Sequence, residues 1–324
     1  MNTRTRLLTE LKKNSGKFIS GETLSYMLGI SRAAISKHIA VLKESGYSVD
    51  ASPKIGYRLT GTTQLVLPDE IRYGLETKIL GQADIVHYTI VDSTNDRAKA
   101  LAIQGASEGT IVVAEEQSAG RGRKGRSWLS ANGDGICLSL ILRPSMPPGE
   151  ISQITLMTAV AIAETLLEIS GADVNIKWPN DILVNGKKIA GILTEMSMEM
   201  DVIDYIIIGL GLNVNTEKKL FGEEIKDLAT SLYIVTGIHF SRSEIIRLFL
   251  TRFEKYYLRV QSDGFSSIIK RWKELSNIIG KYVTVDISGR KISGTVDDIG
   301  EDGVMILKDE DDKKHRIISG DVLL

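Results

Sequence analysis

Residues 177–195 read KWPNDILVNGKKIAGILTE, and this stretch predicts a β-hairpin. Asn185-Gly186 is a strong signal for a two-residue hairpin turn, because both residues tolerate the positive φ that such a turn requires. Apolar residues on either side predict strands at residues 182–184 and 187–196. A further strand at residues 202–209 extends the hairpin, so the chain is expected to build a sheet here.

Polar side chains are concentrated beside this hairpin. Asn180 and Asp181 end the KWPND turn just before the first strand, and Lys188 stands near the start of the second. A rigid hairpin would hold Lys188 close to both of them, which is an arrangement that suits a catalytic site.

A second informative stretch is GRGRKGRSW at residues 120–128. It falls between strands predicted at residues 110–115 and 135–142, in a segment rich in glycine and basic residues. Such a segment predicts a mobile surface loop, and its glycines would let the backbone approach a phosphate. The P-loop spacing GxxxxGK[ST] is absent. On these residues alone, an anion-handling loop, a nonspecific nucleic-acid patch and a plain solvated loop all remain open.

Short polar or glycine-rich runs accompany two other predicted strands. Asp92-Ser93-Thr94-Asn95 lies between a strand at residues 85–91 and a helix at residues 98–102, so it either binds a ligand or caps the helix. Gly209-Leu210-Gly211-Leu212-Asn213 ends the strand that begins at residue 202. Its two glycines allow either a ligand to lie against the backbone or close packing of the strand.

The remaining apolar patterns predict scaffold. Long amphipathic helices are expected at residues 151–169, 243–260 and 265–274. From Gly280 the pattern changes to short strands separated by Gly and Asp, which predicts a small β-barrel-like domain. Its strands are expected at residues 282–287, 291–296, 304–307 and 316–318.

The first 60 residues predict a winged helix-turn-helix. Ser20 and Ser31 can cap two short helices, and Gly29 can end the first of these in the left-handed conformation. A helix with a leucine face precedes them, and two short strand-like runs follow as the wing. The segments are the face of Leu7, Leu8 and Leu11, helices at 21–28 and 32–45, and strands at 47–50 and 56–60.

Basic residues are concentrated in the same segment. Residues 1–60 contain far more Lys and Arg than Asp and Glu, although the whole chain has a net charge of −1. This asymmetry favours a polyanionic partner, with helix side chains facing the major groove and wing cations meeting phosphates. A helical interaction domain that never touches DNA is the alternative. The candidates are Arg32, Ala33, Ser36 and Lys37 on the helix, and Lys54 and Arg58 on the wing.

Length and composition limit the class of protein. A chain of 324 residues with 43% hydrophobic and 25% charged residues predicts a globular protein of two or three domains. One cysteine, Cys137, allows no internal disulfide and fits a reducing cytosol. No signal-peptide pattern and no apolar run of ~18 residues is expected to direct the chain to a membrane. We therefore expect a cytoplasmic α+β multidomain protein, with domains at residues 1–65, 66–275 and 276–324.

Three motifs carry a family resemblance. GRGRKGRSW, KWPNDILVNGKKIAGIL and GLGLNVN occur in the order and approximate separation of the biotin–protein ligases. Residues 1–60 resemble the operator-binding domain of biotin repressors, so the whole chain resembles a bifunctional biotin ligase and biotin-operon repressor. The resemblance implies a winged helix-turn-helix, a central mixed-sheet α/β ligase domain similar to class II aminoacyl-tRNA synthetases, and an SH3-like C-terminal β-barrel.

The resemblance also implies a reaction. Biotin and Mg-ATP would give biotinyl-5′-adenylate and pyrophosphate, and a lysine of a biotin carboxyl carrier protein would then accept the biotin. ATP and biotin would be substrates, and Mg²⁺ would neutralise the leaving pyrophosphate, although no protein metal cage is visible in the sequence.

By resemblance, Ser93 and Thr94 would contact the ureido ring of biotin, Asn95 would support them, and Gln117 would lie over the biotin with the loop glycines. The complete set of biotin and adenylate contacts implied is Ser93, Thr94, Asn95, Gln117, Gly120, Arg121, Gly122, Arg123, Arg126, Trp128, Asn180, Lys188, Gly209, Gly211 and Asn213.

Three of the implied site residues would be catalytic. Lys188 would bridge the biotin carboxylate and the α-phosphate; Lys187 is the less favoured alternative, because strand alternation points it to the opposite face. Arg123 would contact phosphate and retain the adenylate. Asp181 would either orient the adenylate or accept a proton from the acceptor lysine, and both roles stay open. Trp128 and Trp178 would offer flat faces to the adenine or the loop, or else pack in the core.

The implied partners are a biotin carboxyl carrier protein of acetyl-CoA carboxylase or another carboxylase, operator DNA, and a second copy of the chain once the adenylate is bound. Three alternatives are a ligase without operator binding, a catalytically dead DNA-binding sensor of a small molecule, and a lipoate-type ligase. Lys188 and the intact GRGRKGRSW segment, called the arginine loop from here on, argue against a dead sensor. The basic N-terminal segment argues against the loss of DNA binding.

Overall fold

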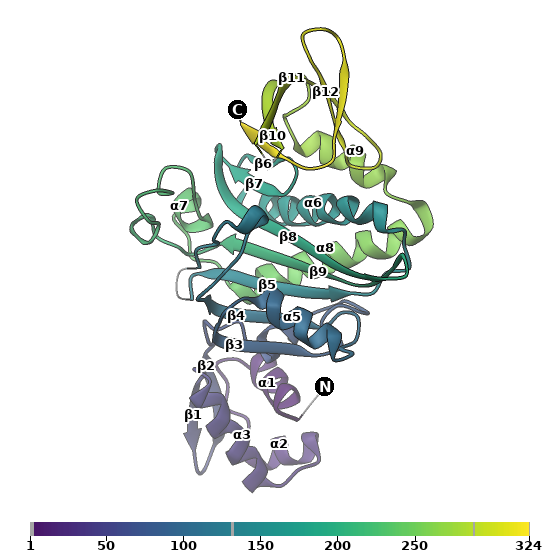
Figure 1. The fold of residues 1–324 in the computed structure, drawn as a ribbon. Helices are drawn as coiled ribbons and strands as arrows, with labels where there is room; N and C mark the ends of the chain where they lie inside the picture. The colour runs from purple at the N-terminus through teal and green to yellow at the C-terminus, as the bar shows by residue number, and fades with distance from the viewer. Residues whose placement is uncertain (1–2, 131–132, 288, 324) are drawn as a thin grey trace. The chain divides into compact units, whose positions relative to one another are not determined.

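The computed structural model describes residues 3–130, 133–287 and 289–323 (Figure 1). The chain divides into two compact units, Met1–Leu75 with Ser241–Ser243, and Glu76–Phe240 with Glu244–Leu324. Within the described residues, Pro148–Ser170 is long and apolar enough to cross a membrane by length and composition, which was not expected from the sequence. Because 67% of its apolar window is buried, a core helix accounts for this composition equally well.

The first unit is a winged helix-turn-helix, as predicted. The Ser20 hydroxyl accepts a hydrogen bond from the Thr23 amide at 3.0 Å. The Ser31 hydroxyl accepts one from the Ala34 amide at 3.2 Å, and Gly29 ends the intervening helix with a φ of 68°. Its elements are α1 (Thr3–Lys13), α2 (Gly21–Leu28), α3 (Arg32–Glu44), β1 (Ser48–Ser52), β2 (Gly56–Gly61) and α4 (Pro68–Arg72).

Helical side chains build the core of this unit. The predicted leucine face of α1 is buried together with Ile35, Ile39 and Leu42 of α3, and β1 pairs antiparallel with β2 to form the wing. The segment after the wing is also packed: Asp69 and Glu70 of α4 are buried and form ion pairs with Arg4 and Lys12 of α1, each at 2.6 Å. The unit therefore continues to Leu75.

The second unit is built on a seven-stranded mixed sheet of order β3-β4-β5-β9-β8-β7-β6. Strands β3 and β4 are parallel and the other neighbours are antiparallel. The predicted Asn185-Gly186 turn joins β7 to β8, with φ values of 51° and 76°. The strands are β3 (Ile85–Val91), β4 (Ile111–Gln117), β5 (Gly135–Leu142), β6 (Val174–Lys177), β7 (Asp181–Val184), β8 (Lys187–Glu199) and β9 (Val202–Asn213).

Helices cover both faces of this sheet, with α5 in front and α6 and α8 behind in the view of Figure 1. α5 packs on the face that carries Ile207 of β9. Thr155 of α6 hydrogen-bonds Thr194 at 2.8 Å, and Thr194 pairs with Ile208, so α6 lies on the opposite face. The helices are α5 (Thr94–Ile103), α6 (Ile151–Ser170), α7 (Leu232–Thr236), α8 (Arg242–Asp263) and α9 (Ser266–Leu275), with 3-10 turns η1 (Arg123–Gly125), η2 (Pro148–Glu150) and η3 (Lys218–Leu220).

The end of the chain forms a five-stranded antiparallel sheet of order β13-β12-β11-β10-β14. The loop before β12 ties this sheet to α6. Ser152 donates to the Asp302 carbonyl at 2.9 Å, and Gln153 donates to the Glu301 carbonyl at 2.7 Å. The strands are β10 (Tyr282–Ile287), β11 (Arg290–Ile299), β12 (Met305–Lys308), β13 (Lys314–Ile317) and β14 (Asp321–Leu323).

The predicted elements agree with the structure in type, but some bounds and short elements differ. β9 continues to Asn213, past the residue at which the strand was expected to end, and β6 and β14 were not predicted. Trp178 is 2% exposed and its indole N–H donates to the Gly303 carbonyl at 3.3 Å. Trp178 is therefore packed in the core, although it also lines the pocket described below.

Candidate active site

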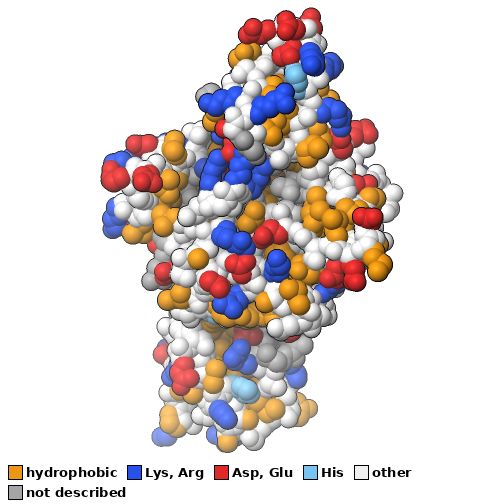
Figure 2. Space-filling model, in the orientation of Figure 1, with side chains coloured by type: hydrophobic (Ala, Val, Ile, Leu, Met, Phe, Trp, Pro, Cys, Tyr) orange, Lys and Arg blue, Asp and Glu red, His pale blue; other side chains and the backbone are white. Residues whose placement is uncertain are grey.

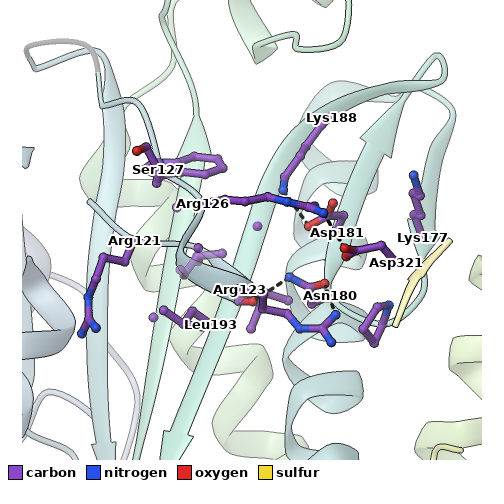
Figure 3. Close-up of a pocket in the computed structure, with 18 of the residues that line it drawn as sticks. Arg121, Arg123, Arg126, Ser127, Lys177, Asn180, Asp181, Lys188, Leu193 and Asp321 are labelled. Carbon is purple, nitrogen blue, oxygen red and sulfur yellow. Dashed lines mark hydrogen bonds and ion pairs between the residues drawn. The ribbon is translucent and has the colours of Figure 1, made fainter. Parts of the chain in front are cut away.

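A pocket on the α5 face of the seven-stranded sheet brings most of the predicted site residues together (Figure 3). Its cavity volume is about 240 Å³, below the ~300–1,000 Å³ typical of ligand sites. Residues of the loop at positions 120–128 form part of its lining. The predicted residues that line it are Ser93, Thr94, Asn95, Gln117, Arg121, Gly122, Arg123, Arg126, Trp128, Asn180, Asp181, Lys188, Gly209 and Gly211.

The floor of the pocket consists of glycines on paired strands. Gly191 of β8 pairs with Gly211 of β9, and the pair Leu193 and Gly209 lies next to them on the same face. A Cβ on Gly211 would lie 2.3 Å from the Trp128 ring. One on Gly209 would lie 2.2 Å from the Asn95 amide oxygen. Close packing against this chain's own side chains therefore requires both glycines.

Lys188 is held between the floor and the KWPND turn. Its Nζ lies 2.7 Å from Asp181 Oδ1 and 5.7 Å from the centre of the Trp128 ring. Its backbone is fixed as well, because the Lys188 amide donates to the Leu228 carbonyl at 2.8 Å. Lys188 lines the pocket and Lys187 does not, as strand alternation predicted.

The KWPND turn also fixes one arginine of the loop. Asn180 receives a hydrogen bond from Arg123 Nη1 at 3.1 Å, and its own amide donates to the Ile192 carbonyl at 2.9 Å. Burial lowers the pKa of the Arg123 guanidinium, and the charges of Asp321 and Asp181 offset this in part. The hydrogen bond to Asn180 thus fixes the Arg123 guanidinium at the pocket, although Arg123 itself belongs to the loop.

The other loop cations are paired with acidic side chains at either end of the pocket. Arg121 bonds Asp96 of α5 and lies 3.6 Å from Glu195 of β8. In Figure 3, Arg121 points away from the cluster that contains Arg123, Arg126 and Lys188. Figure 2 shows basic side chains gathered in the middle of this face, with acidic side chains among them.

A neutral polar network forms the opposite end of the site. The Thr94 amide donates to Gln117 Oε1 at 2.7 Å. Ser139 Oγ lies 2.8 Å from Thr94 Oγ1 and 2.6 Å from Asn95 Oδ1. Asn95 Nδ2 in turn donates to Glu195 at 2.7 Å. Apart from Glu195, which also lies 3.6 Å from Arg121, these are uncharged hydrogen-bonding groups, and Thr94, Asn95 and Gln117 line the pocket, which suits an uncharged polar ring.

Two predicted contacts lie outside the pocket lining, and three relevant residues were missed. Gly120 closes the base of the loop by accepting a bond from the Trp128 amide at 2.8 Å. Asn213 donates to the Thr230 carbonyl at 3.0 Å. The missed residues are Ser139, Glu195 and Asp321. A place for Glu195 in the site could have been predicted from the sequence, because strand alternation puts it on the same face as Gly191.

The predicted DNA-facing residues lie on the surface of the first unit. Arg32, Ala33, Ser36 and Lys37 on α3 are exposed, as is Lys54 on the wing. The remaining wing cation, Arg58, bonds Asp50 at 2.6 Å and lies 4.6 Å from the centre of the Phe18 ring. The exposed positions share one helix and one wing, as a groove-and-phosphate contact would require.

Residues 3–130, 133–287 and 289–323 contain no cluster of three or more His, Cys, Asp or Glu side chains able to hold a metal ion. Asp181 and Asp321 are the carboxylates at the end of the pocket where Arg123, Arg126 and Lys188 gather, called the basic end below. Asp181 forms an ion pair with Lys188, and Asp321 forms one with Lys124.

Comparisons with known protein families identify the class of protein to which the chain belongs. The "Biotin/lipoate A/B protein ligase family" model matches residues 87–213, an "HTH domain" model residues 3–58, and a "Biotin protein ligase C terminal domain" model residues 278–324. The chain belongs to the biotin–protein ligase family, in the form that carries an N-terminal helix-turn-helix. The resemblance drawn from the sequence motifs is therefore confirmed.

Individual relatives extend over nearly the whole chain. It is 41% identical to the bifunctional ligase/repressor BirA of Bacillus subtilis over 98% of this chain and 97% of that protein. It is 31% identical to BirA of Escherichia coli, over 91% of this chain and 90% of the relative. The solved biotin protein ligase of Aquifex aeolicus, in complex with biotin and ATP, covers 74% of this chain and 97% of its own, with a TM-score of 0.64 at 31% identity.

Proposed function

We propose that the chain is an ATP-dependent biotin–protein ligase, a biotin–[acetyl-CoA-carboxylase] ligase, that also represses transcription in response to biotin. Family membership supports this function, and one geometric observation carries it. Lys188 lines the same pocket as the uncharged side chains of Thr94 and Gln117 and the loop cation Arg123, with its ammonium group 2.7 Å from Asp181. Such a junction suits two anions that must meet, one attached to an uncharged ring and the other to a polyphosphate.

In the first step a biotin carboxylate oxygen attacks the α-phosphorus of ATP. A new P–O bond forms, the bond from the α-phosphorus to the bridging oxygen breaks, and pyrophosphate leaves. Lys188 would neutralise both the carboxylate and the α-phosphate, which would reduce their repulsion. Arg123, fixed by Asn180, and Arg126 would contact the phosphates.

The neutral end of the site would position the biotin. Ser93 and Thr94 would bond the ureido ring, and Asn95 is held by Ser139 and Glu195. Gln117 and the loop glycines Gly120 and Gly122 would close over it, with Gly209, Gly211, Trp128 and Asn213 completing the set of expected contacts.

In the second step the acceptor amine attacks the acyl carbon. An amide C–N bond forms, the C–O bond to the phosphate breaks, AMP leaves, and the amine loses a proton. Asp181 lies beside Lys188 and would orient the adenylate or accept that proton. Ordering of the arginine loop over the mixed anhydride would keep water out until the acceptor arrives.

Mg²⁺ would accompany the nucleotide, because the carboxylates near the basic end are paired with cations of this chain and form no cage in the described residues. When bound, it would neutralise phosphate charge. The acceptor would be a lysine of a biotin carboxyl carrier protein, and the enzyme would work in the cytoplasm.

Finer features of the architecture belong to the same proposal. The domains would be residues 1–65, 66–275 and 276–324, the central sheet would be of the class II aminoacyl-tRNA synthetase type, and the C-terminal sheet would be an SH3-like barrel. The adenylate would promote a homodimer through the central sheet, and two helix-turn-helix units would then bind a palindromic operator.

Transfer of radiolabelled biotin to a biotin carboxyl carrier protein with Mg-ATP tests the ligase. The native chain should transfer label, Lys188→Ala should not, and Lys187→Ala should serve as the active control. No transfer by the native chain would leave the DNA-binding sensor as the better reading. Label transferred only when lipoate replaces biotin would indicate a lipoate-type ligase.

A further inference from the structure

Asp321, at the start of the last strand, reaches the basic end of the pocket from a part of the chain that no motif marked. Its carboxylate lies 3.1 Å from Lys124 Nζ and also bonds the Arg126 guanidinium. Lys124 makes a second contact with the same sheet, 3.2 Å from the Asp286 carbonyl. Figure 3 shows Arg126 and Asp321 extending toward each other across the pocket. The arginine loop is thereby attached to the C-terminal sheet.

The Asp321 carboxylate carries its charge in this position. Burial by itself would raise the pKa of Asp321, but the hydrogen bond from Lys124 and the charges of Arg126 and Lys124 outweigh it and hold the pKa below its usual value. The side chain is 21% exposed, so water screens the contact only in part. A fixed negative charge therefore stands at the end of the pocket where a polyphosphate is expected.

The sheet that carries Asp321 is held by hydrogen bonds outside the pocket, whereas the base of the loop is held by the Trp128–Gly120 hydrogen bond and by Arg123 on Asn180. Trp178 and Gln153 donate hydrogen bonds to carbonyls of the loop before β12, which fixes the C-terminal sheet to buried parts of the catalytic unit. Lys124 and Arg126 lie at the tip of the loop, where they and Gly125 are exposed. When the contact with Asp321 breaks, this tip is the part of the loop that can move.

We propose that Asp321 is an internal anion that holds Lys124 and Arg126 while no nucleotide is bound, and that the polyphosphate of ATP displaces it. This inference rests on the proposed function, because that function assigns Arg126 to the phosphates; the contact of phosphate with Lys124 goes beyond it. The cavity of about 240 Å³ fits the idea, since the loop held on Asp321 leaves little room. Release from Asp321 would open the basic end as the phosphates enter.

Removal of the Asp321 charge should change the affinity for phosphate in a direction that depends on the role of Asp321. If Asp321 competes with phosphate, Asp321→Asn should bind phosphate more tightly than the native chain. If Asp321 instead assists the nucleotide, the same substitution should weaken binding. Loss of the contact should also free the loop for tryptic cleavage after Lys124 and Arg126 when no ligand is present.

Titration calorimetry with inorganic pyrophosphate tests the first consequence on the full chain. We expect Asp321→Asn to bind about 3- to 5-fold more tightly, the effect of removing one partly screened charge pair. Asp297→Asn is the matched control: it removes an equal charge from the same sheet, where Asp297 pairs with Lys314 at 2.7 Å, and does not line the pocket. Unchanged or weaker binding by Asp321→Asn overturns the proposal.

Limited trypsin digestion provides the second arm. Cleavage within the loop of the ligand-free protein should be faster for Asp321→Asn than for the native chain and Asp297→Asn, and equal rates overturn the proposal. In the double variant Lys124→Gln/Asp321→Asn, the gain in pyrophosphate affinity over Lys124→Gln alone should shrink. A full gain there would also overturn it. Biotin-dependent ATP–pyrophosphate exchange by the native chain separates the two claims, because its absence refutes the ligase and leaves the pyrophosphate titration meaningful.

Discussion

The ammonium group of Lys188 lies 2.7 Å from the carboxylate of Asp181, although the two residues sit on different strands of one hairpin. The Asn185-Gly186 turn sets the pairing of Leu183 with Lys188, and a shift in register beyond Leu183 then pairs Asp181 with Gly191. The lysine is therefore positioned before any substrate enters.

Replacement of Lys188 by alanine should abolish adenylate formation. The charge that offsets two converging anions would be lost, and the loss of one such preorganised group lowers rates by about 10²–10³-fold. Biotin-dependent ATP–pyrophosphate exchange measures this step. Lys187→Ala, one position away and outside the pocket lining, should retain most of the exchange activity. Equal losses in the two variants would contradict the assignment of Lys188.

Replacement of Asp181 by asparagine distinguishes the two roles left open for this carboxylate. If Asp181 positions Lys188, adenylate formation and biotin transfer should both slow by a similar factor, about tenfold, and this is the result we expect. Single-turnover measurements resolve the two steps. A loss confined to transfer, accompanied by a changed pH profile of that step, would assign proton acceptance to Asp181 instead.

Local signals in the sequence were sufficient for the elements that carry the site. The positive-φ pair Asn185-Gly186 defines its own turn, and Ser20 and Ser31 cap helices because their hydroxyls reach amides three residues away. Because side chains alternate between the faces of a strand, Lys188 could be predicted to face the site and Lys187 to point away from it. Each of these features depends on neighbours within a few residues.

Long-range partners were not predictable from these local patterns. Ser139 joins the polar network through Thr94 and Asn95, more than 40 residues earlier in the chain, and Asp321 meets Lys124 across nearly 200 residues. The strand that contains Asp321 has three residues, too short for a periodic signal. The space over Gly211 was open to two interpretations until Trp128 was placed against it.

Replacement of Gly211 by alanine should expel Trp128 from the floor of the pocket. The added Cβ would lie 2.3 Å from the Trp128 ring, and such overpacking costs about 1–3 kcal/mol. We expect weaker biotin binding by calorimetry and a lower melting temperature. Gly149→Ala is the control, since a Cβ there meets nothing within 4 Å. Native biotin affinity in Gly211→Ala would show that Trp128 does not shape the site.

Replacement of Arg123 by glycine should leave adenylate formation possible but release the adenylate early. The hydrogen bond to Asn180 anchors this guanidinium, and hydrogen bonds of charged groups contribute about 1.5–3 kcal/mol, so release should be roughly 10- to 100-fold faster. Dissociation of pre-formed biotinyl-5′-adenylate measures it. Asn180→Ala, which removes the anchor and keeps the charge, should produce a smaller increase. Adenylate held as tightly as by the native chain would contradict the prediction.

Replacements on the first unit should separate base reading from phosphate contact. Arg32→Ala on α3 should reduce the preference for operator over nonspecific DNA. Lys54→Ala on the wing should weaken both complexes alike and lower the salt slope of binding by about one. Lys13→Ala, an exposed lysine on α1 outside the predicted contact residues, is the control. Adenylate should tighten operator binding of the native chain, and by linkage the operator should tighten adenylate binding by the same factor. Operator affinity that is equal in the ligand-free and adenylate-bound protein would remove the repressor from the proposal and leave the ligase standing.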